Sequence, residues 1–175
     1  MAQPAGGTKA DIHALPLSGG GEPRRVVGDA FGKREPVISP DGTTAMVPSK
    51  QDNIGRGTLR SGVNLNFQNT VRSISSRIDL TTSSETFGAR IDHNNASLAS
   101  AAAFDGYGVI LFVALETSRE VAVVDAHNHA EFFRINVGRA PQGLAVSPDG
   151  TRLYVHNFMD RTVGVYDISR LMSEG

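Results

Sequence analysis

Two histidines in a short polar stretch are the first residues whose spacing could do chemistry. His127 and His129 flank Asn128, and in an extended segment this spacing places both imidazoles on one side, as a metal site requires. The pattern does not supply an assured acidic third ligand, and an exposed turn between two strands explains it better. We therefore keep both histidines as metal candidates and assign no metal to them.

A second polar run contains Arg90, Asp92, His93, Asn94 and Asn95. Oxygen and nitrogen groups of this kind bind small ligands or calcium when a rigid scaffold holds their loop. The same aspartate and asparagines are also suited to local turns, in which the side chain bonds to nearby backbone. We predict a ligand-binding loop here and no catalytic residue. A lyase or hydrolase that uses His93 is the enzymatic alternative.

Three residues of the types found in catalytic triads, Ser147, Asp149 and His156, lie close together in the sequence. A triad needs a serine exposed at a strained elbow beside an oxyanion hole, and the chain has no Gly-x-Ser-x-Gly motif. Ser147 and Asp149 instead belong to a turn that recurs along the chain. We do not predict a triad.

Four arginines lie in one stretch that has no acidic residue: Arg56, Arg60, Arg72 and Arg77. On one face they would form a positive patch suited to an acidic partner. The net charge of the whole chain is -1, and aromatic residues do not alternate with these arginines as they do in single-strand binders. We therefore predict no nucleic-acid partner.

The composition limits the remaining chemistry. The chain has 175 residues with 39% hydrophobic and 20% charged residues, which is typical of a globular protein. It has no cysteine, which excludes disulfides, thiolate ligands and the paired thiols that attach a c-type haem. No apolar run is long enough to span a bilayer, and residues 1–21 lack the pattern of a signal peptide. We expect any export signal to lie outside this chain.

The elements that must position these residues are repeats. An Asp-Gly pair between two apolar runs occurs at three places, Asp41-Gly42, Asp105-Gly106 and Asp149-Gly150. A second landmark, an aspartate after an apolar strand-like segment, recurs as Asp79, Asp125 and Asp167. Apart from the first Asp-Gly interval, which an insertion lengthens, both landmarks return after about 40 to 45 residues, the period of a propeller blade. Each Asp-Gly pair is predicted to turn one strand into the next, with its glycine in the left-handed region.

The predicted fold is therefore all-β: a β-propeller segment of about three four-stranded antiparallel blades, forming an incomplete propeller. We predict outer strands of a preceding blade within residues 1–34, blade 1 over 35–96, blade 2 over 97–140 and an incomplete blade 3 over 141–175. Blade 1 is stretched by an inserted arm near 54–70. The polar run from Arg90 to Asn95 falls in the link from an outer strand to the next innermost strand, so we expect it at the mouth of the central channel. Because an open arc exposes sheet edges, we expect either a longer protein or several chains that associate to complete the ring.

One stretch carries a family resemblance. Residues 138–157 closely resemble the YVTN repeat, with Tyr154-Val155-His156-Asn157 in the place of its naming tetrapeptide. The following Phe158-Met159-Asp160-Arg161-Thr162-Val163 looks like versions fused to a cytochrome c peroxidase-like haem domain. The resemblance implies an exported bacterial protein in the periplasm or on the cell surface. It implies no cofactor in this chain, and haem c only in a fused domain outside it.

The leading functional hypothesis is a non-catalytic β-propeller scaffold for protein or ligand binding. The resemblance adds an attached redox domain as an expected partner. The alternatives are the propeller portion of a haem-containing peroxidase-like or electron-transfer protein whose catalytic residues lie outside this chain, and a propeller lyase or hydrolase.

Overall fold

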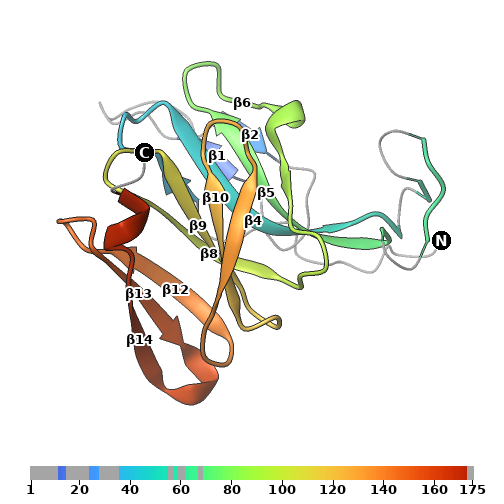
Figure 1. The fold of residues 1–175 in the computed structure, drawn as a ribbon. Coiled ribbons are helices and arrows are strands. Elements are labelled where there is room, and N and C mark those ends of the chain that lie inside the picture. The colour runs from blue at the N-terminus through green and yellow to red at the C-terminus, as the bar shows by residue number, and fades with distance from the viewer. Residues whose placement is uncertain are drawn as a thin grey trace.

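The computed structural model describes residues 12–14, 24–27, 36–54, 57–58, 62–66 and 69–172. All of the paired strands within these ranges are antiparallel. Three successive sheets, called blades 1 to 3 below, follow one another in space as they do along the chain (Figure 1). The all-β propeller architecture predicted from the repeats is confirmed.

Blade 1 consists of β3 (Val37–Ile38), β4 (Thr44–Asp52), β5 (Val71–Asp79), β6 (Ser84–Glu85) and β7 (Ile91–Asp92), where β6 and β7 both pair with β5. Blade 2 consists of β8 (Ala99–Phe104), β9 (Ile110–Leu115), β10 (Glu120–Asp125) and β11 (Glu131–Asn136). Blade 3 has β12 (Pro141–Val146), β13 (Arg152–Asn157) and β14 (Thr162–Asp167). Short 3₁₀ helices η2 (Phe87–Ala89), η3 (Phe158–Asp160) and η4 (Ser169–Met172) lie between or after strands.

A separate two-stranded sheet precedes blade 1. It pairs β1 (Ile12–Ala14) with β2 (Arg24–Val27), and β2 contacts β6. These strands are the ones that the sequence assigned to an earlier blade, while the rest of the 1–34 segment lies outside the described residues. The predicted blade boundaries stay predictions. No helix in the described part of the chain is long and apolar enough to cross a membrane.

The core lies between the blades. Between blades 1 and 2, Met46 and Ile91 pack against Leu111, Val113 and other residues of blade 2. A second cluster fills the space between blades 2 and 3. Its buried residues are Ile110, Phe112, Val121, Val123, Leu153, Val155 and Ile168. Alternate residues of a strand point to opposite faces, so blade 2 supplies one row of side chains to each cluster.

The Asp-Gly turns of blades 1 and 3 have the predicted form. Gly42 and Gly150 both have φ of 71°. Asp41 accepts hydrogen bonds from the Ser39 hydroxyl at 2.5 Å and the Thr43 amide at 3.0 Å. Asp149 repeats the arrangement in blade 3. These bonds, with the Ser39 hydroxyl first, lower the pKa of Asp41 to about 2.

The turn of blade 2 differs from the prediction. Gly106 is not in the left-handed region, and Gly108 has φ of 74° instead. Asp105 takes the place of Ser39, because its Oδ1 accepts the Ile110 amide at 2.9 Å as the Ser39 hydroxyl accepts the Thr44 amide. The turn of blade 2 therefore aligns with the turn of blade 1 when it is shifted by two residues from the match of the two Asp-Gly pairs. In this alignment Asp105 matches Ser39, and Gly108 matches Gly42. The turn role predicted for Asp105 and Gly106 is wrong in this detail.

An arm extends from blade 1. β4 and β5 are each nine residues long, against six for their counterparts in blades 2 and 3. Beyond them Thr58 and Asn64 form an isolated antiparallel bridge, and the Asn53 side chain donates to the Asn69 carbonyl at 2.8 Å. Figure 1 shows this hairpin projecting away from the three blades. It lies where the sequence predicts an insertion.

Candidate functional site

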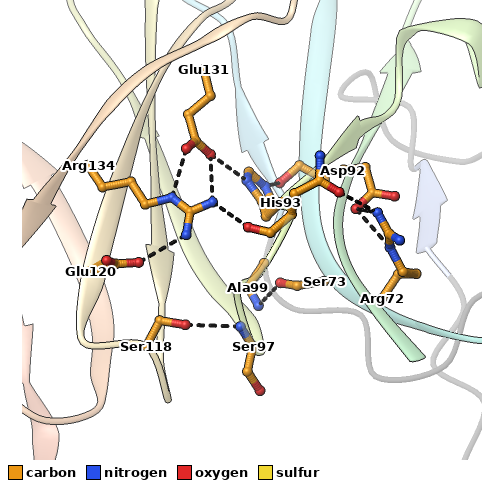
Figure 2. A network of polar contacts seen from close by, with 12 residues as sticks. Arg72, Ser73, Asp92, His93, Ser97, Ala99, Ser118, Glu120, Glu131 and Arg134 are labelled. Carbon is orange, nitrogen blue, oxygen red and sulfur yellow. Dashed lines mark hydrogen bonds and ion pairs between the residues drawn. The ribbon is translucent and has the colours of Figure 1, made fainter. Parts of the chain in front are cut away.

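His93 is the center of a buried polar cluster between blades 1 and 2. It follows β7 directly, and only 1% of its surface is exposed. Its Nε2 lies 2.9 Å from the hydroxyl of Ser75, a fully buried residue of β5. Its Nδ1 lies 3.8 Å from Oε2 of Glu131 on β11, longer than a hydrogen bond but close for a charge contact (Figure 2). With the proton on Nδ1, facing the carboxylate, Nε2 accepts from Ser75.

Glu131 continues the cluster along blade 2. Its Oε1 accepts from Arg134 Nε at 2.7 Å, and Arg134 also reaches Glu120 on β10 at 3.0 Å. His93 first, and then Arg134, lower the pKa of Glu131 to about 2. Arg134 also donates to the backbone carbonyl of Asn94 at 2.7 Å. This arginine thus ties the fourth strand of blade 2 to the loop that leaves blade 1.

The rest of the predicted ligand-binding loop is also engaged. Asp92 pairs with Arg72 at 2.6 Å, and Arg72 also donates to the Asn94 side chain at 2.7 Å. Arg90 forms an ion pair with Glu85, and its guanidinium lies 4.6 Å from the center of the Phe87 ring. Figure 2 shows Asp92 and Arg72 meeting on one side of the cluster and Glu131 and Arg134 on the other.

Asn95 has a φ of 55°, the left-handed conformation that asparagine tolerates in turns. Its neighbor Asn94 is the residue of the loop that Arg72 and Arg134 both contact. The structure therefore places Asp92, His93 and Asn94 in or beside the His93 cluster, gives Arg90 separate partners, and places Asn95 at the bend that follows. Whether the loop binds a ligand stays a prediction.

A pocket of 280 Å³ lies over this cluster. Its lining includes Arg90, Asp92 and Asn94 of the predicted loop, together with His129, Glu131 and Arg134. These residues belong to β7, β11 and the segments beside them. We expected the loop at the mouth of the central channel, but the pocket that it lines is bounded by the outer strands of two blades.

The channel side has its own pocket of 360 Å³, lined by residues of the first strands β3, β8 and β12. Its polar side chains are already paired: the Ser100 hydroxyl donates to the Pro141 carbonyl at 2.6 Å, and Gln142 donates to Glu116 at 3.0 Å. Ala101, Ala102 and Gly143 form much of the remaining wall. Short side chains of this kind give the pocket its shape but provide no polar group that could bind or react.

Ser75, His93 and Glu131 resemble a nucleophile, base and orienting acid in their order of contact. Ser75 is completely buried and His93 nearly so, and a substrate carbonyl must reach the serine for acyl transfer. The arrangement is therefore suited to joining two blades and not to nucleophilic catalysis. Sequence reasoning found His93 and missed Ser75 and Glu131, because the contact of Ser75 depends on the pairing of β5 with β7 and that of Glu131 on how two blades pack.

The two metal-candidate histidines lie in the turn between β10 and β11, as their position in the repeat suggested. His127 is exposed, and its amide bonds to Asp125 at 2.8 Å. His129 Nε2 lies 3.5 Å from the guanidinium of Arg77. Burial first, and then the charge of Arg77, lower the pKa of His129. No group of three or more potential ligands is gathered for a metal within the described ranges.

Ser147, Asp149 and His156 do not come together as a catalytic triad. Ser147 donates to Asp149 within its own turn at 2.5 Å, whereas the ring of His156 lies edge-on to Phe158 with centers 6.3 Å apart. Of the four arginines in the acid-free stretch, Arg72 and Arg77 contact different partners, Asp92 and Thr44. Arg56 and Arg60 lie outside the described residues.

No protein-family pattern matches this chain, and no curated protein matches it. Solved structures do. The Kuenenia stuttgartiensis hydrazine synthase matches with a TM-score of 0.66 and 16% identity over 85% of this chain and 48% of that one. The RRP9 WD40 repeats match with a TM-score of 0.59 and 15% identity over 83% of this chain and 38% of that one.

A putative 6-phosphogluconolactonase from Bacteroides uniformis matches with a TM-score of 0.57 and 14% identity, over 89% of this chain and 43% of that chain. The chain thus spans less than half the length of each of these three structures. Identities this low show the fold alone. Together with the blades described above, they define the chain as a β-propeller-like protein.

Proposed function

We propose that this chain is a non-catalytic β-propeller scaffold that presents its surface to a protein or ligand. The observation that supports this function is the use of its reactive side chains. Ser75 bonds to His93 within blade 1, and His93 faces Glu131 of blade 2, while large apolar side chains such as Val163 and Met159 are 61% and 62% exposed. Exposed apolar surface of this kind marks binding sites.

The location and the attached partner follow from the resemblance of residues 138–157 to the YVTN repeat. We propose that the protein is bacterial and exported, with the scaffold in the periplasm or on the cell surface. Its partner is then a surface protein, a cell-surface ligand or an attached redox domain.

A second candidate function is the propeller portion of a haem-containing peroxidase-like or electron-transfer protein. The observation that favours it is at η3. Phe158 and Met159 lie in the segment that resembles haem-fused versions, and they are 57% and 62% exposed. Arg139 and Asp160 hold this segment against blade 3 with a contact of 2.5 Å. In this case haem c and the catalytic residues belong to a domain outside the chain.

An enzymatic assay tests the scaffold directly. The purified chain is incubated with 6-phosphogluconolactone, the substrate suggested by the name of one structural neighbor, and hydrolysis is followed by proton release. We expect a rate equal to the buffer rate, for the native chain and for His93→Ala. A rate above the buffer that disappears in His93→Ala, and persists in the exposed-site variant His127→Ala, would contradict the scaffold and support the hydrolase.

Sequencing the encoding DNA past both ends of the chain separates the two candidate functions. A reading frame that continues into a Cys-x-x-Cys-His motif would favour the haem protein. Further repeats without such a motif, or a frame that ends with this chain, would favour the scaffold.

A further inference from the structure

The outer strand of blade 1 is interrupted beside the 280 Å³ pocket. β6 and β7 both pair with β5, but residues 86–90 between them lie opposite only Ser76 and Arg77 of β5. The 3₁₀ helix η2 takes up the extra length. The outer strand of blade 2, β11, is continuous. Blade 1 therefore leaves regular pairing at the point where Arg90 and Asp92 enter the lining of the pocket.

A β-bulge shapes the opposite wall of the pocket. On blade 2, Phe133 pairs with Val123, but the next pair joins Glu131 to Val124, so that Phe132 is the extra residue of the bulge. Val124 belongs to the core between blades 1 and 2. In regular pairing Phe132 would lie opposite Val124, on the side of blade 1, and the bulge puts Glu131 there instead. Bulges re-aim side chains in this way and are common beside functional sites.

The size and lining of the pocket limit what it can hold. It lies between the outer strands of two neighboring blades, both present in the structure. Its volume of 280 Å³ is just below the roughly 300 Å³ at which ligand pockets begin. Apart from Ile91, its lining side chains are polar or charged. The pocket is therefore suited to one small polar ring and not to a large apolar ligand.

The charged groups of the lining are already neutralised by ion pairs. These pairs are Arg90 with Glu85, Asp92 with Arg72 and Glu131 with Arg134. The guanidinium groups repel a bare metal ion, and the carboxylates paired with them repel an added anion. A charged ligand would have to displace one partner of a formed pair. The pocket thus favours a neutral ligand.

Hydrogen-bonding groups remain in spite of these pairs. Arg72 contacts Oδ1 of Asp92, while Oδ2 has no hydrogen-bond partner among the described residues, and this side chain is 42% exposed (Figure 2). Asn94 accepts from Arg72 through its side-chain oxygen, which leaves the hydrogens of its amide nitrogen for a ligand. Burial and then the charge of Arg77 lower the pKa of His129, and the neutral ring, which faces Arg77 with Nε2, carries its hydrogen on Nδ1. The pocket thus offers both acceptors and donors.

We propose that this pocket binds one neutral hexose ring of a carbohydrate. Adjacent sugar hydroxyls each donate and accept hydrogen bonds, so they can bond to the Asp92 oxygen and to the Asn94 and His129 donors at the same time. This inference rests on the proposed scaffold function and names the class of its ligand. The interrupted strand of blade 1 and the bulge of blade 2 position the groups that hold the ring.

Nuclear magnetic resonance of the isotope-labelled chain tests the site. Glucose, galactose, mannose and N-acetylglucosamine are added separately, and the amide chemical shifts are followed. We expect at least one of these sugars to give saturable shifts confined to residues 90–94 and 129–134, with a Kd of about 1 mM. Glycerol, which has hydroxyls but no ring, is the control and should give no saturable shift. No saturable shift with any of the sugars, or saturable shifts only at other residues, would overturn the proposal.

Matched variants locate the ligand. Asn94→Ala should weaken sugar binding about three- to tenfold, because one donor to the ligand is lost. Asn136→Ala, at an exposed asparagine at the far end of β11, should leave it unchanged. His129→Ala and the control His127→Ala form a second pair with the same expectation. All of these variants must keep the native circular dichroism spectrum. A loss at Asn94 or His129 but not at its control supports the site, and equal affinities within both pairs would overturn it.

Other ligands and the source of the sugar are separated by further titrations. Calcium chloride or sodium phosphate that shifts the same residues saturably, where the sugars do not, would overturn the neutral ligand. Methyl glycosides that bind as the free sugars do would indicate the terminal ring of a glycan, and binding of the free sugars alone would indicate a monosaccharide. Both results support a hexose site. A failed sugar titration leaves the scaffold itself untouched, because the scaffold is contradicted by catalysis in the lactone assay and not by the identity of its ligand.

Discussion

The two contacts between blades use the same repeat positions with opposite chemistry. Blade 2 turns Phe112, Val121 and Val123 toward blade 3, and all three are fully buried. Blade 1 turns the equivalent residues toward blade 2, but two of them are Ser75 and Arg77, which contact His93 and His129. One interface is thus an apolar core, and the other combines apolar packing with a polar cluster.

The difference shows how a propeller tolerates polar residues between its blades. An apolar interface is stabilised by burial of area and tolerates modest shifts, because dispersion and hydrophobic contacts are not directional. A buried hydroxyl and imidazole must meet at hydrogen-bond distance or lose their solvation without return. The contact between Ser75 and His93 therefore holds the His93 ring in place within blade 1, where it faces Glu131 of blade 2.

The largest loss of stability is expected in the apolar interface between blades 2 and 3. Phe112→Ala should lower the free energy of unfolding by about 3 to 5 kcal/mol, because it removes a fully buried ring and leaves a cavity between blades 2 and 3. Tyr107→Ala, at a side chain that is 81% exposed, should change it by less than about 0.5 kcal/mol. Urea unfolding measures both. Similar losses in the two variants would contradict the assigned core.

A smaller loss is expected in the polar interface. His93→Ala should cost about 1 to 3 kcal/mol, because the Ser75 hydroxyl loses its buried partner. His127→Ala, at an exposed position in a turn, serves as the control and should have little effect. A neutral His93→Ala in thermal and urea unfolding would mean that the cluster does not join the blades.

The turn of blade 2 gives a matched pair of glycines. Gly108→Ala should cost about 1 to 2 kcal/mol, because a side chain is strained at positive φ. A Cβ there would also lie 3.1 Å from Pro40. Gly106→Ala should be close to neutral, because its φ is ordinary and no atom lies within 4 Å of the added Cβ. A larger fall of the thermal midpoint in Gly106→Ala than in Gly108→Ala would contradict this assignment and would support the direct alignment of the three Asp-Gly pairs.

The smallest and most gradual change in stability is expected from pH. The pKa values of Asp41 and Asp149 fall from 3.8 to about 2 in the folded chain, and that of Glu131 falls from 4.5 to about 2. A lowered folded pKa stabilises the protein above the unfolded value, and this contribution is lost as pH falls toward the folded value. The urea midpoint should therefore decline between about pH 4.5 and 2. The decline should be smaller in Glu131→Gln, and an unchanged slope would contradict the Glu131 contacts.

The repeat made most of the fold predictable. Asp125 and Asp167 end the third strands of their blades as the sequence suggested, because strand alternation and turn chemistry are local properties. The two-residue misalignment of the blade 2 turn has a local cause too. Asp105 bonds the backbone in the way that Ser39 does, so the same two letters serve different positions of the turn. With Gly108 as the repeated glycine, it precedes Gly150 by the same interval that separates Asp125 from Asp167.

The site was less predictable than the fold. His93 was found because it lies in a conspicuous polar run, but its partners Ser75 and Glu131 lie on strands of two blades. No local pattern marks Ser75, one of three serines in β5. Its role depends on the pairing of β5 with β7, and that of Glu131 on the packing of two blades, both long-range properties that alternation and spacing do not encode.

The most direct test of this account is a double-mutant cycle between His93→Ala and Glu131→Gln, measured by urea unfolding at neutral pH. If the two side chains join the blades through their contact at 3.8 Å, the summed losses of the single variants should differ from the loss of the double variant by about 1 kcal/mol. Losses that add to within about 0.3 kcal/mol would show that the two side chains do not interact, and would contradict the polar contact between blades 1 and 2.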